Sequence, residues 1–467
     1  MKATGPLAVA AANTSDEASA LYSLRLGAIW RQMRREHISF WMICIYLFIE
    51  YVRPQSIIPS LDFLPWAKIF LALSGITLLA DKQRRWVADP ANKWMTLFLL
   101  AIIVSSLLAT YPQFSWDHFM DFFGWFVIYF LIINIVRTET RLLVLLGVFV
   151  LCSFKLSLFG ARTWAGRGFA FTNWGLQGPP GYFENSGEFA IQMLMLTPVA
   201  YELARFLRPH LSRLKYWVLM LVPATGVMSI LGASSRGAQL ALGYQIYGIL
   251  LKRRLSIKAL VTVGVIVATL ITLLPEEQKA RFTTAGDDVT SQQRLLYWKH
   301  GVAMIEDHPV LGVGYYNFPR YFALHWPQDM LRGPAYTPEG VMISELPHNI
   351  FVQIGTDTGV TGLLLFGMLI FRTWKTEREI RLMARQRPDG KPFAPLAHGL
   401  LVAMWGFVIA GQFVTVTYYP FFWINLAFMV ALNNITRQHY LAQPQAKAPA
   451  QRPDADMTVP RPLSSPG

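Results

Sequence analysis

The apolar residues of this 467-residue chain come in long uninterrupted blocks rather than in periodic stripes. A helix that crosses about 30 Å of hydrocarbon needs roughly 20 predominantly apolar residues. Twelve blocks come close to that length, at 38–56, 64–80, 93–111, 118–136, 142–160, 187–206, 215–233, 236–251, 256–274, 348–371, 395–416 and 419–437. Only 15% of the residues are charged, against about 25% in an average soluble domain. We therefore predict an all-α polytopic membrane protein with about 12 transmembrane helices.

The chain carries 42 Lys and Arg against 28 Asp and Glu, a formal charge of +14 that in a soluble protein would point to nucleic acid. The positions of these charges give another explanation, because cytoplasmic loops of membrane proteins are enriched in Lys and Arg. If both termini lie inside, 30 of the 42 flank the inner ends of the blocks and ten the outer ends. The last two, Lys68 and Lys155, lie within blocks but near enough to helix ends to reach the surface. The distribution predicts two cytoplasmic termini.

The blocks divide the chain into five parts. Residues 1–37 form a cytoplasmic tail without the apolar core of a signal peptide. Nine transmembrane helices follow in 38–274, then a long outer loop in 275–347 and three more helices in 348–437. The Pro-rich residues 438–467 are expected to be a disordered cytoplasmic tail.

The outer loop is rich in aromatic residues, and a structureless loop of this length would be unusual, so we expect a folded cap. Thr290–Gln293 has the pattern of a capping box and predicts the start of a helix of about 16 residues. His308-Pro309 would end that helix, and Gly312–Gly314 would form the next turn. The apolar face of the helix would consist of Leu295, Trp298, Val302 and Ile305.

Motifs for nucleotides and metals are missing from the sequence. It contains no GxxxxGK[ST] and no HExxH, and Gly312-Val-Gly314 lacks the third glycine and the strand–helix context of a dinucleotide site. Cys44 and Cys152 both lie in apolar blocks, which does not suit a disulfide scaffold. We therefore predict neither a metal site nor a cofactor.

Cationic groups at the outer ends of helices remain as candidates for chemistry. Arg236 follows Ser234-Ser235 between two blocks, where a guanidinium beside a helix N-terminus suits an anion such as phosphate. The alternative is an arginine that only sets topology or reaches the interface. Arg294, near the start of the loop helix, is either a solvated helix residue or a second anion contact. The same two interpretations hold for Arg162 and Arg167, which lie in a Gly-rich outer loop.

His348 lies where the long loop meets the tenth block, in Pro347-His348-Asn349. A histidine titrates near neutral pH and can act on a hydroxyl group, although a buried histidine with satisfied hydrogen bonds is equally compatible with the pattern. Glu184-Asn185 and Glu188 stand at the outer start of the sixth block, where a carboxylate can pair with an arginine or accept a proton.

Four motifs occur in a fixed order along residues 236–362. They are Ser235-Arg236-Gly237, Arg294 with Trp298, Pro309-Val-Leu-Gly312-Val-Gly314, and His348-Asn349 followed by Asp357-Thr-Gly359-Val-Thr-Gly362. This series resembles the shared region of the O-antigen ligase and Wzy-type polymerase family, and the architecture resembles that family over 38–437. Tyr51-Val-Arg53-Pro54-Gln55 further resembles the subset associated with exosortase systems.

Two departures from the family pattern are visible. The family more often has Glu where this chain has Asp357, and the shorter carboxylate keeps the charge but changes its reach. The exosortase-associated subset tends to have an Asp-Asn-Asn run where this chain has Glu184-Asn185-Ser186, which weakens the resemblance to that subset but not to the family.

The resemblance implies a GT-C-like membrane glycosyltransferase that acts on the periplasmic face of a bacterial inner membrane without a metal or cofactor. Its donor would be a glycan on undecaprenyl diphosphate. Its acceptor would be a lipid A–core sugar in a ligase, another lipid-linked glycan in a polymerase, or a protein in some relatives.

The resemblance also suggests roles for individual residues. Arg236 and Arg294 would hold the diphosphate, with Arg162 or Arg167 as a further clamp, and His348 would activate the acceptor. Supporting positions would be Glu184, Asn185, Asn349 and Asp357.

Two alternatives stay open. A polymerase of the same family would use the same donor, and nothing in the sequence decides between acceptors. A polytopic transporter or flippase would be expected to show two related halves, whereas here one long loop after the ninth block breaks any six-plus-six symmetry.

Overall fold

The computed structural model describes residues 20–82, 84–172, 175–251, 288–386 and 393–442. The predicted ninth span (256–274), the first part of the outer loop and most of both tails lie outside these residues. The helices and strands are α2 (Leu26–Arg35), α3 (Ile38–Val52), α4 (Pro54–Ile57), η1 (Pro59–Leu61), α5 (Trp66–Ala80), α6 (Pro90–Leu107), α7 (Pro112–Asp117), α8 (Phe119–Ile135), α9 (Glu139–Gly166), α10 (Ser186–Leu207), η2 (Arg208–His210), α11 (Arg213–Gly232), α12 (Arg236–Leu251), α15 (Val289–Asp307), α16 (Phe318–His325), η3 (Pro327–Asp329), β1 (Ala335–Tyr336), β2 (Met342–Ile343), α17 (Ile350–Gln386), α18 (Ala394–Ala410) and α19 (Pro420–Ala442).

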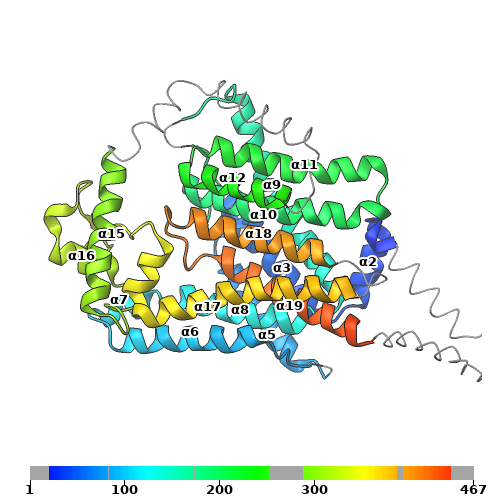
Figure 1. The fold of residues 1–467 in the computed structure, drawn as a ribbon, viewed down its shortest axis with the longest axis horizontal. Helices are drawn as coiled ribbons and strands as arrows, with labels where there is room; N and C mark the ends of the chain where they lie inside the picture. The colour runs from blue at the N-terminus through cyan, green and yellow to red at the C-terminus, as the bar shows by residue number, and fades with distance from the viewer. Residues whose placement is uncertain (1–19, 83, 173–174, 252–287, 387–392, 443–467) are drawn as a thin grey trace, which may run out of the picture.

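The chain is a bundle of long helices with a small folded segment at one end (Figure 1). Helix α10 lies at the centre, packed by α9, α11, α12 and α18, and α17 packs against α6 and α19. Every predicted span outside 256–274 is occupied by a helix. Within the described residues, five helices are long and apolar enough to cross a membrane: Pro90–Leu107, Pro112–Ile135, Glu139–Gly166, Arg213–Gly232 and Ile350–Gln386. The protein is therefore an all-α, multi-pass membrane protein, and the number of 12 spans stays a prediction.

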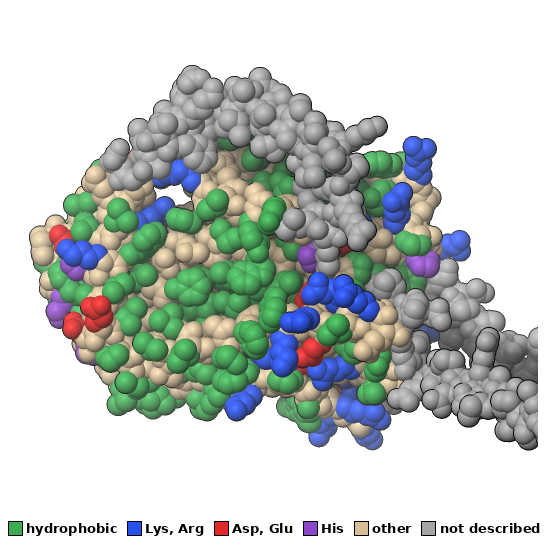
Figure 2. Space-filling model, viewed as in Figure 1, with side chains coloured by type: hydrophobic (Ala, Val, Ile, Leu, Met, Phe, Trp, Pro, Cys, Tyr) green, Lys and Arg blue, Asp and Glu red, His purple; other side chains and the backbone are tan. Residues whose placement is uncertain are grey.

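The described part of the outer loop is folded. It consists of α15, α16 and the two-stranded β1–β2 hairpin, and it lies at the opposite end of the bundle from α2 (Figure 1). It has a hydrophobic core of its own, formed by Tyr297, Met304, Val313, Phe318, Phe322, Ala323 and Met330. On the face shown in Figure 2, Lys and Arg gather mostly toward the end of the bundle that holds α2. This separation agrees with the predicted orientation, which stays a prediction.

Two details predicted for the loop helix are wrong. Its N-cap is Asp288, whose carboxylate accepts a hydrogen bond from the backbone N–H of Ser291 at 2.9 Å, and not a residue of the Thr290–Gln293 box. Its apolar face is also different, because Leu295 and Val302 are exposed. The buried side of α15 combines aromatic, polar and small residues that hydropathy alone does not mark as core, namely Gln293, Tyr297, His300, Gly301 and Met304.

Helix α17 extends 15 residues beyond the predicted span 348–371, into the segment between the tenth and eleventh predicted spans. Charged residues stabilise this extension through ion pairs along the helix and with α19. Arg381 lies 3.5 Å from Glu377 one turn before it, and Glu379 accepts from Arg437 of α19 at 2.7 Å. Charged residues in helical register favour continued helix over a loop.

Helix α17 is interrupted at Gly359, where φ is 66° and ψ is −163°. In a bilayer, backbone groups released by such a break need partners within the protein. The loop after α15 supplies them: Val313 N–H donates to the carbonyl of Thr356 at 2.8 Å, and Val360 N–H donates to the carbonyl of Pro309 at 2.8 Å. The predicted turn at Gly312–Gly314, with φ of 69° and 123°, thus docks into the break in α17.

The Gly359→Ala variant should be less stable than the parent chain, because this backbone region is essentially restricted to glycine and costs other residues about 1–3 kcal/mol. An added Cβ would also meet the backbone of Pro309 and Val310. Thermal unfolding of the detergent-solubilised protein should show a lowered midpoint. Gly367→Ala is the matched control, since Gly367 lies in the same helix with nothing within 4 Å of its Cβ position. Equal midpoints for the two variants would contradict the role of the break.

Candidate functional site

Arg236 connects the start of α12 to the start of α15. Its Nη2 lies 3.2 Å from Oδ2 of Asp288 and 3.3 Å from Oγ of Ser291, and 34% of its side chain is exposed. Ser234, two residues earlier, has a φ of 56°, which turns the chain sharply between α11 and α12. Burial opposes ionisation of Asp288, but hydrogen bonds from Ser291 and Arg236 outweigh it and lower the pKa of this carboxyl to about 2. The guanidinium therefore faces a carboxylate that stays ionised at neutral pH.

Arg294 follows on α15 and is partly buried. Burial lowers its pKa, and the positive charge of Arg236 lowers it further. Its Nε is buried and has no hydrogen-bond partner among the described residues. A buried charge with an unmade hydrogen bond is destabilising, so an anionic group placed here would stabilise the guanidinium.

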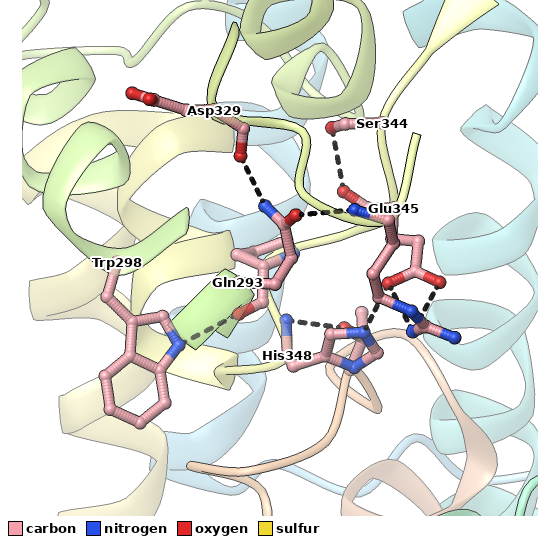
Figure 3. Close-up of polar contacts among 9 residues, drawn as sticks. Gln293, Trp298, Asp329, Ser344, Glu345 and His348 are labelled. Atoms are coloured by element: carbon pink, nitrogen blue, oxygen red, sulfur yellow. Dashed lines mark hydrogen bonds and ion pairs between the residues drawn. The ribbon is translucent and has the colours of Figure 1, made fainter. Parts of the chain in front are cut away.

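His348 is held from two sides at the point where the outer segment meets α17. Its backbone N–H donates to Oγ1 of Thr415 at 2.9 Å, and the carbonyl of Pro347 accepts from Nε1 of Trp298 at 2.9 Å (Figure 3). Its φ is 53°, a conformation that non-glycine residues adopt mainly where the surroundings impose it. The backbone of His348 is therefore held beside α15.

The imidazole of His348 is biased toward its neutral form. Its Nε2 lies 3.5 Å from Oε2 of Glu345, and 21% of its side chain is exposed. Burial lowers the pKa of His348 from its ordinary value of 6.5, and the positive charges of Arg294 and Arg332 lower it further, while Glu345 acts in the opposite direction. A neutral imidazole at pH 7 keeps a free nitrogen lone pair that can accept a proton.

Glu345 and Arg332 complete this cluster, and the sequence analysis assigned no role to either. Nη1 of Arg332 donates to both carboxylate oxygens of Glu345, at 2.9 and 3.0 Å. The hydrogen bond with His348 and the charge of Arg332 lower the pKa of Glu345. Gln293 accepts from the backbone N–H of Arg332 at 3.3 Å and donates to the carbonyl of Asp329 at 2.9 Å, which fixes this corner of the cap (Figure 3).

The other predicted residues lie in different surroundings. Arg162 and Arg167 are exposed at the end of α9, and their side chains make no hydrogen bond or ion pair within the described part of the chain. Glu184 is exposed. Their predicted roles remain untested.

Asn185 and Asn349 both act as helix caps. Asn185 forms a capping box with Glu188 at the start of α10. Oδ1 of Asn349 accepts from the backbone N–H of Phe351 at 2.9 Å and of Val352 at 3.2 Å, at the start of α17. These contacts account for both residues without a substrate.

Asp357 is fully buried in α17 beside the break at Gly359. Oδ1 accepts from the backbone N–H of Tyr316 at 3.1 Å, and Oδ2 accepts from the hydroxyl of Tyr418 at 2.9 Å. Its carbonyl accepts from the hydroxyl of Ser105. Asp357 therefore connects α17 to Ser105, Tyr316 and Tyr418. None of these hydrogen bonds involves a residue of the Arg236–His348 cluster.

No group of three or more His, Cys, Asp or Glu side chains with metal-binding geometry is found among the described residues. The cluster consists of three guanidinium groups, two carboxylates and one imidazole, namely those of Arg236, Arg294, Arg332, Asp288, Glu345 and His348. Its net positive charge and the partly buried Arg294 suit an anionic ligand, and its neutral imidazole suits proton transfer.

Comparison with protein families gives two matches. Residues 219–367 match the model of the O-antigen ligase family, and this region contains Arg236, Arg294, Arg332, Glu345 and His348. Residues 29–208 match a family of unknown function, DUF5935. Comparison with curated proteins gives no match.

The titration of His348 tests the electrostatics of this cluster. Its pKa should lie below 6.5, and Glu345→Gln should lower it further, because the carboxylate favours the charged imidazolium. NMR of the protein labelled on histidine, with the signal assigned by its loss in His348→Gln, measures both values. Glu306→Gln, an exposed carboxylate of α15, should leave the titration unchanged. A higher pKa in Glu345→Gln would contradict the described pairing.

Proposed function

We propose that this membrane protein transfers a glycan from undecaprenyl diphosphate to an acceptor hydroxyl on the periplasmic face of the bacterial inner membrane, because residues 219–367 match the O-antigen ligase family. The observation that carries the proposal is that Arg294, whose Nε has no hydrogen-bond partner among the described residues, is near enough for its charge to lower the pKa of His348. The guanidinium of Arg294 suits the leaving diphosphate, and the imidazole of His348 suits the attacking hydroxyl.

The diphosphate is the chemical reason for the arginines. When the bond between the sugar C1 and the diphosphate oxygen breaks, negative charge develops on the leaving group. Guanidinium groups fixed at that point stabilise the charge without reorganisation, and their planar forks match phosphate oxygens. Arg294 would form the inner contact, and Arg236 would exchange part of its contact with Asp288 for a phosphate oxygen.

The acceptor hydroxyl needs a base as its oxygen bonds to C1. In neutral histidine one ring nitrogen donates and the other accepts. With Nε2–H directed at Glu345, Nδ1 of His348 would take the hydroxyl proton, and the carboxylate would stabilise the imidazolium that forms, as an orienting carboxylate does in other His-based sites. A diphosphate is a weak base, so its departure needs no general acid.

Arg332 would hold Glu345 in place rather than touch the substrate, since its guanidinium is already engaged with both oxygens of that carboxylate. The third clamp suggested by the sequence at Arg162 or Arg167 has no support from contacts in the described residues. The polyprenyl chain would lie along the bundle in contact with lipid.

Variants of the three central residues test the mechanism. Arg236→Ala, Arg294→Ala and His348→Ala should each reduce transfer by roughly 10²–10³-fold, the effect of losing about 2.7–4 kcal/mol of transition-state stabilisation. Transfer is measured with membranes and the lipid-linked glycan of the producing cell. Lys299→Ala, an exposed cation of α15, should keep parental activity.

Two results would contradict this mechanism. Full activity of His348→Ala would remove the proposed base. Near-parental activity of Arg236→Lys would show that positive charge suffices and that the bidentate geometry is not used.

A ligase and a polymerase differ only in the acceptor, and deletion of the gene separates them. A ligase deletion should leave long lipid-linked chains unattached to their acceptor, and we expect this result. Accumulation of single repeat units would instead indicate a polymerase. Surface glycans identical to those of the parent strain would contradict glycan transfer and favour a transporter.

A further inference from the structure

A cavity opens beside the segment between α18 and α19. It has a volume of about 560 Å³ and lies between α3, α5, α8 and residues 181–182, 316 and 418–419. This volume falls within the range of about 300–1,000 Å³ that is typical of ligand pockets. The residues of the first site, Arg236, Arg294 and His348, are not part of its wall.

Both sites contact the segment between α18 and α19. In residues 411–419, Thr415 accepts the backbone hydrogen bond of His348 on one side. Tyr418 and Tyr419, three and four residues later, line the cavity on the other side. A substrate with one part at His348 and a further part in the cavity would therefore contact both sides of the same segment.

The charges in the cavity do not suit a diphosphate. Its wall carries two cations, Arg53 and Lys68, and two carboxylic acids, Glu50 and Asp121. Formally these charges cancel, whereas the first site has an excess of cations. Groups of both signs within one cavity suit a neutral ligand that donates and accepts hydrogen bonds.

Two polar atoms of the wall lack partners. Nε of Arg53, a donor, and Oε1 of Gln55, an acceptor, are buried without a hydrogen bond among the described residues. Buried polar atoms in native proteins nearly always find a partner. Both residues belong to Tyr51-Val-Arg53-Pro54-Gln55, a motif that the proposed chemistry at His348 does not use. Both residues line the cavity, and a ligand hydroxyl would reach these two atoms once their side chains turn toward it.

Aromatic rings form much of the remaining wall. Tyr182 packs edge-to-face against Trp125 at 5.5 Å and against Tyr419 at 5.0 Å, and Tyr316 stacks on His118 at 4.0 Å. Pockets of this kind, with aromatic walls and a few placed polar groups, suit amphipathic ligands. A sugar ring has this character, with C–H groups on its faces and hydroxyls around its edge.

We propose that this cavity binds a saccharide unit of the substrate, next to the unit that reacts at His348. The inference rests on the proposed glycan transfer and adds to it a place for the glycan. Arg53, Gln55 and Asp121 would bind hydroxyls, and the tyrosine rings would pack on the sugar face. The unit belongs either to the donor glycan or to the acceptor glycan, and both have the same chemistry.

Direct binding, without turnover, tests the proposal. The full-length chain in detergent micelles is examined by saturation-transfer NMR with two separate probes. One is the oligosaccharide released by mild acid from the lipid-linked glycans of the producing cells. The other is the core oligosaccharide released from their lipid A. We expect one of them to bind, and its identity assigns the cavity to the donor or the acceptor.

Variants show where binding occurs. Arg53→Gln and Asp121→Asn should weaken binding at least tenfold. Lys68→Gln should also weaken binding, and because Lys68 is exposed, this change leaves the packing intact. Asp117→Asn, on the surface of α7, is the matched control and should bind as the parent does. His348→Ala should also bind normally, so a failure of the transfer mechanism is distinguishable from a failure of this inference. Binding of neither probe, or parental binding by folded Arg53→Gln, Asp121→Asn and Lys68→Gln, would overturn it.

Discussion

The break in α17 at Gly359 is the constraint on which the cap and both candidate sites depend. It releases backbone groups that must be paired inside the protein, and the loop at Pro309–Val313 pairs them. The carboxylate of Asp357 then joins the backbone of Tyr316 to the hydroxyl of Tyr418. One interlock therefore fixes the cap on the bundle and positions the segment between α18 and α19.

Both candidate sites follow from that interlock. On one side, the fixed cap brings Arg294 and Trp298 of α15 to Pro347-His348, and Thr415 holds the histidine backbone. On the other side, Tyr316 and Tyr418 become walls of the 560 Å³ cavity. The sites differ in charge, since one has excess cations around a neutral imidazole and the other has balanced charges. This difference matches the two parts of a lipid-linked glycan, an anionic diphosphate and neutral sugars.

The sequence predicted much of the bundle, because apolar length and punctuation by Gly and Pro are local signals. Gly312–Gly314 forms the expected turn, whereas α3 ends at Val52, four residues before the end of the predicted block. Asp288 was missed as a cap because a local pattern favoured Thr290 and could not include the contact of Asp288 with Arg236, which is 52 residues away. Arg332 and Glu345 were missed for the same reason, since their pairing exists only in the folded cap. The one available signal was the position of Glu345 three residues before His348.

The sequence motifs also mixed two kinds of residue that only the structure separates. Asn349 and Asp357 belong to the motifs that carry the family resemblance, yet their contacts are those of a cap and a clamp. Arg236, Arg294 and His348 come from the same motifs but belong to one cluster. Nε of Arg294 has no hydrogen-bond partner among the described residues. Spacing alone gives both groups equal weight.

The central claim is that the diphosphate binds between Arg236, Arg294 and His348. The most direct measurement is an electron cryomicroscopy structure of the full-length chain with undecaprenyl diphosphate in a lipid nanodisc. The account predicts density for both phosphates against the guanidinium groups of Arg236 and Arg294, with the imidazole of His348 beside them. Diphosphate density in the cavity at Arg53, or none at Arg294, would contradict it.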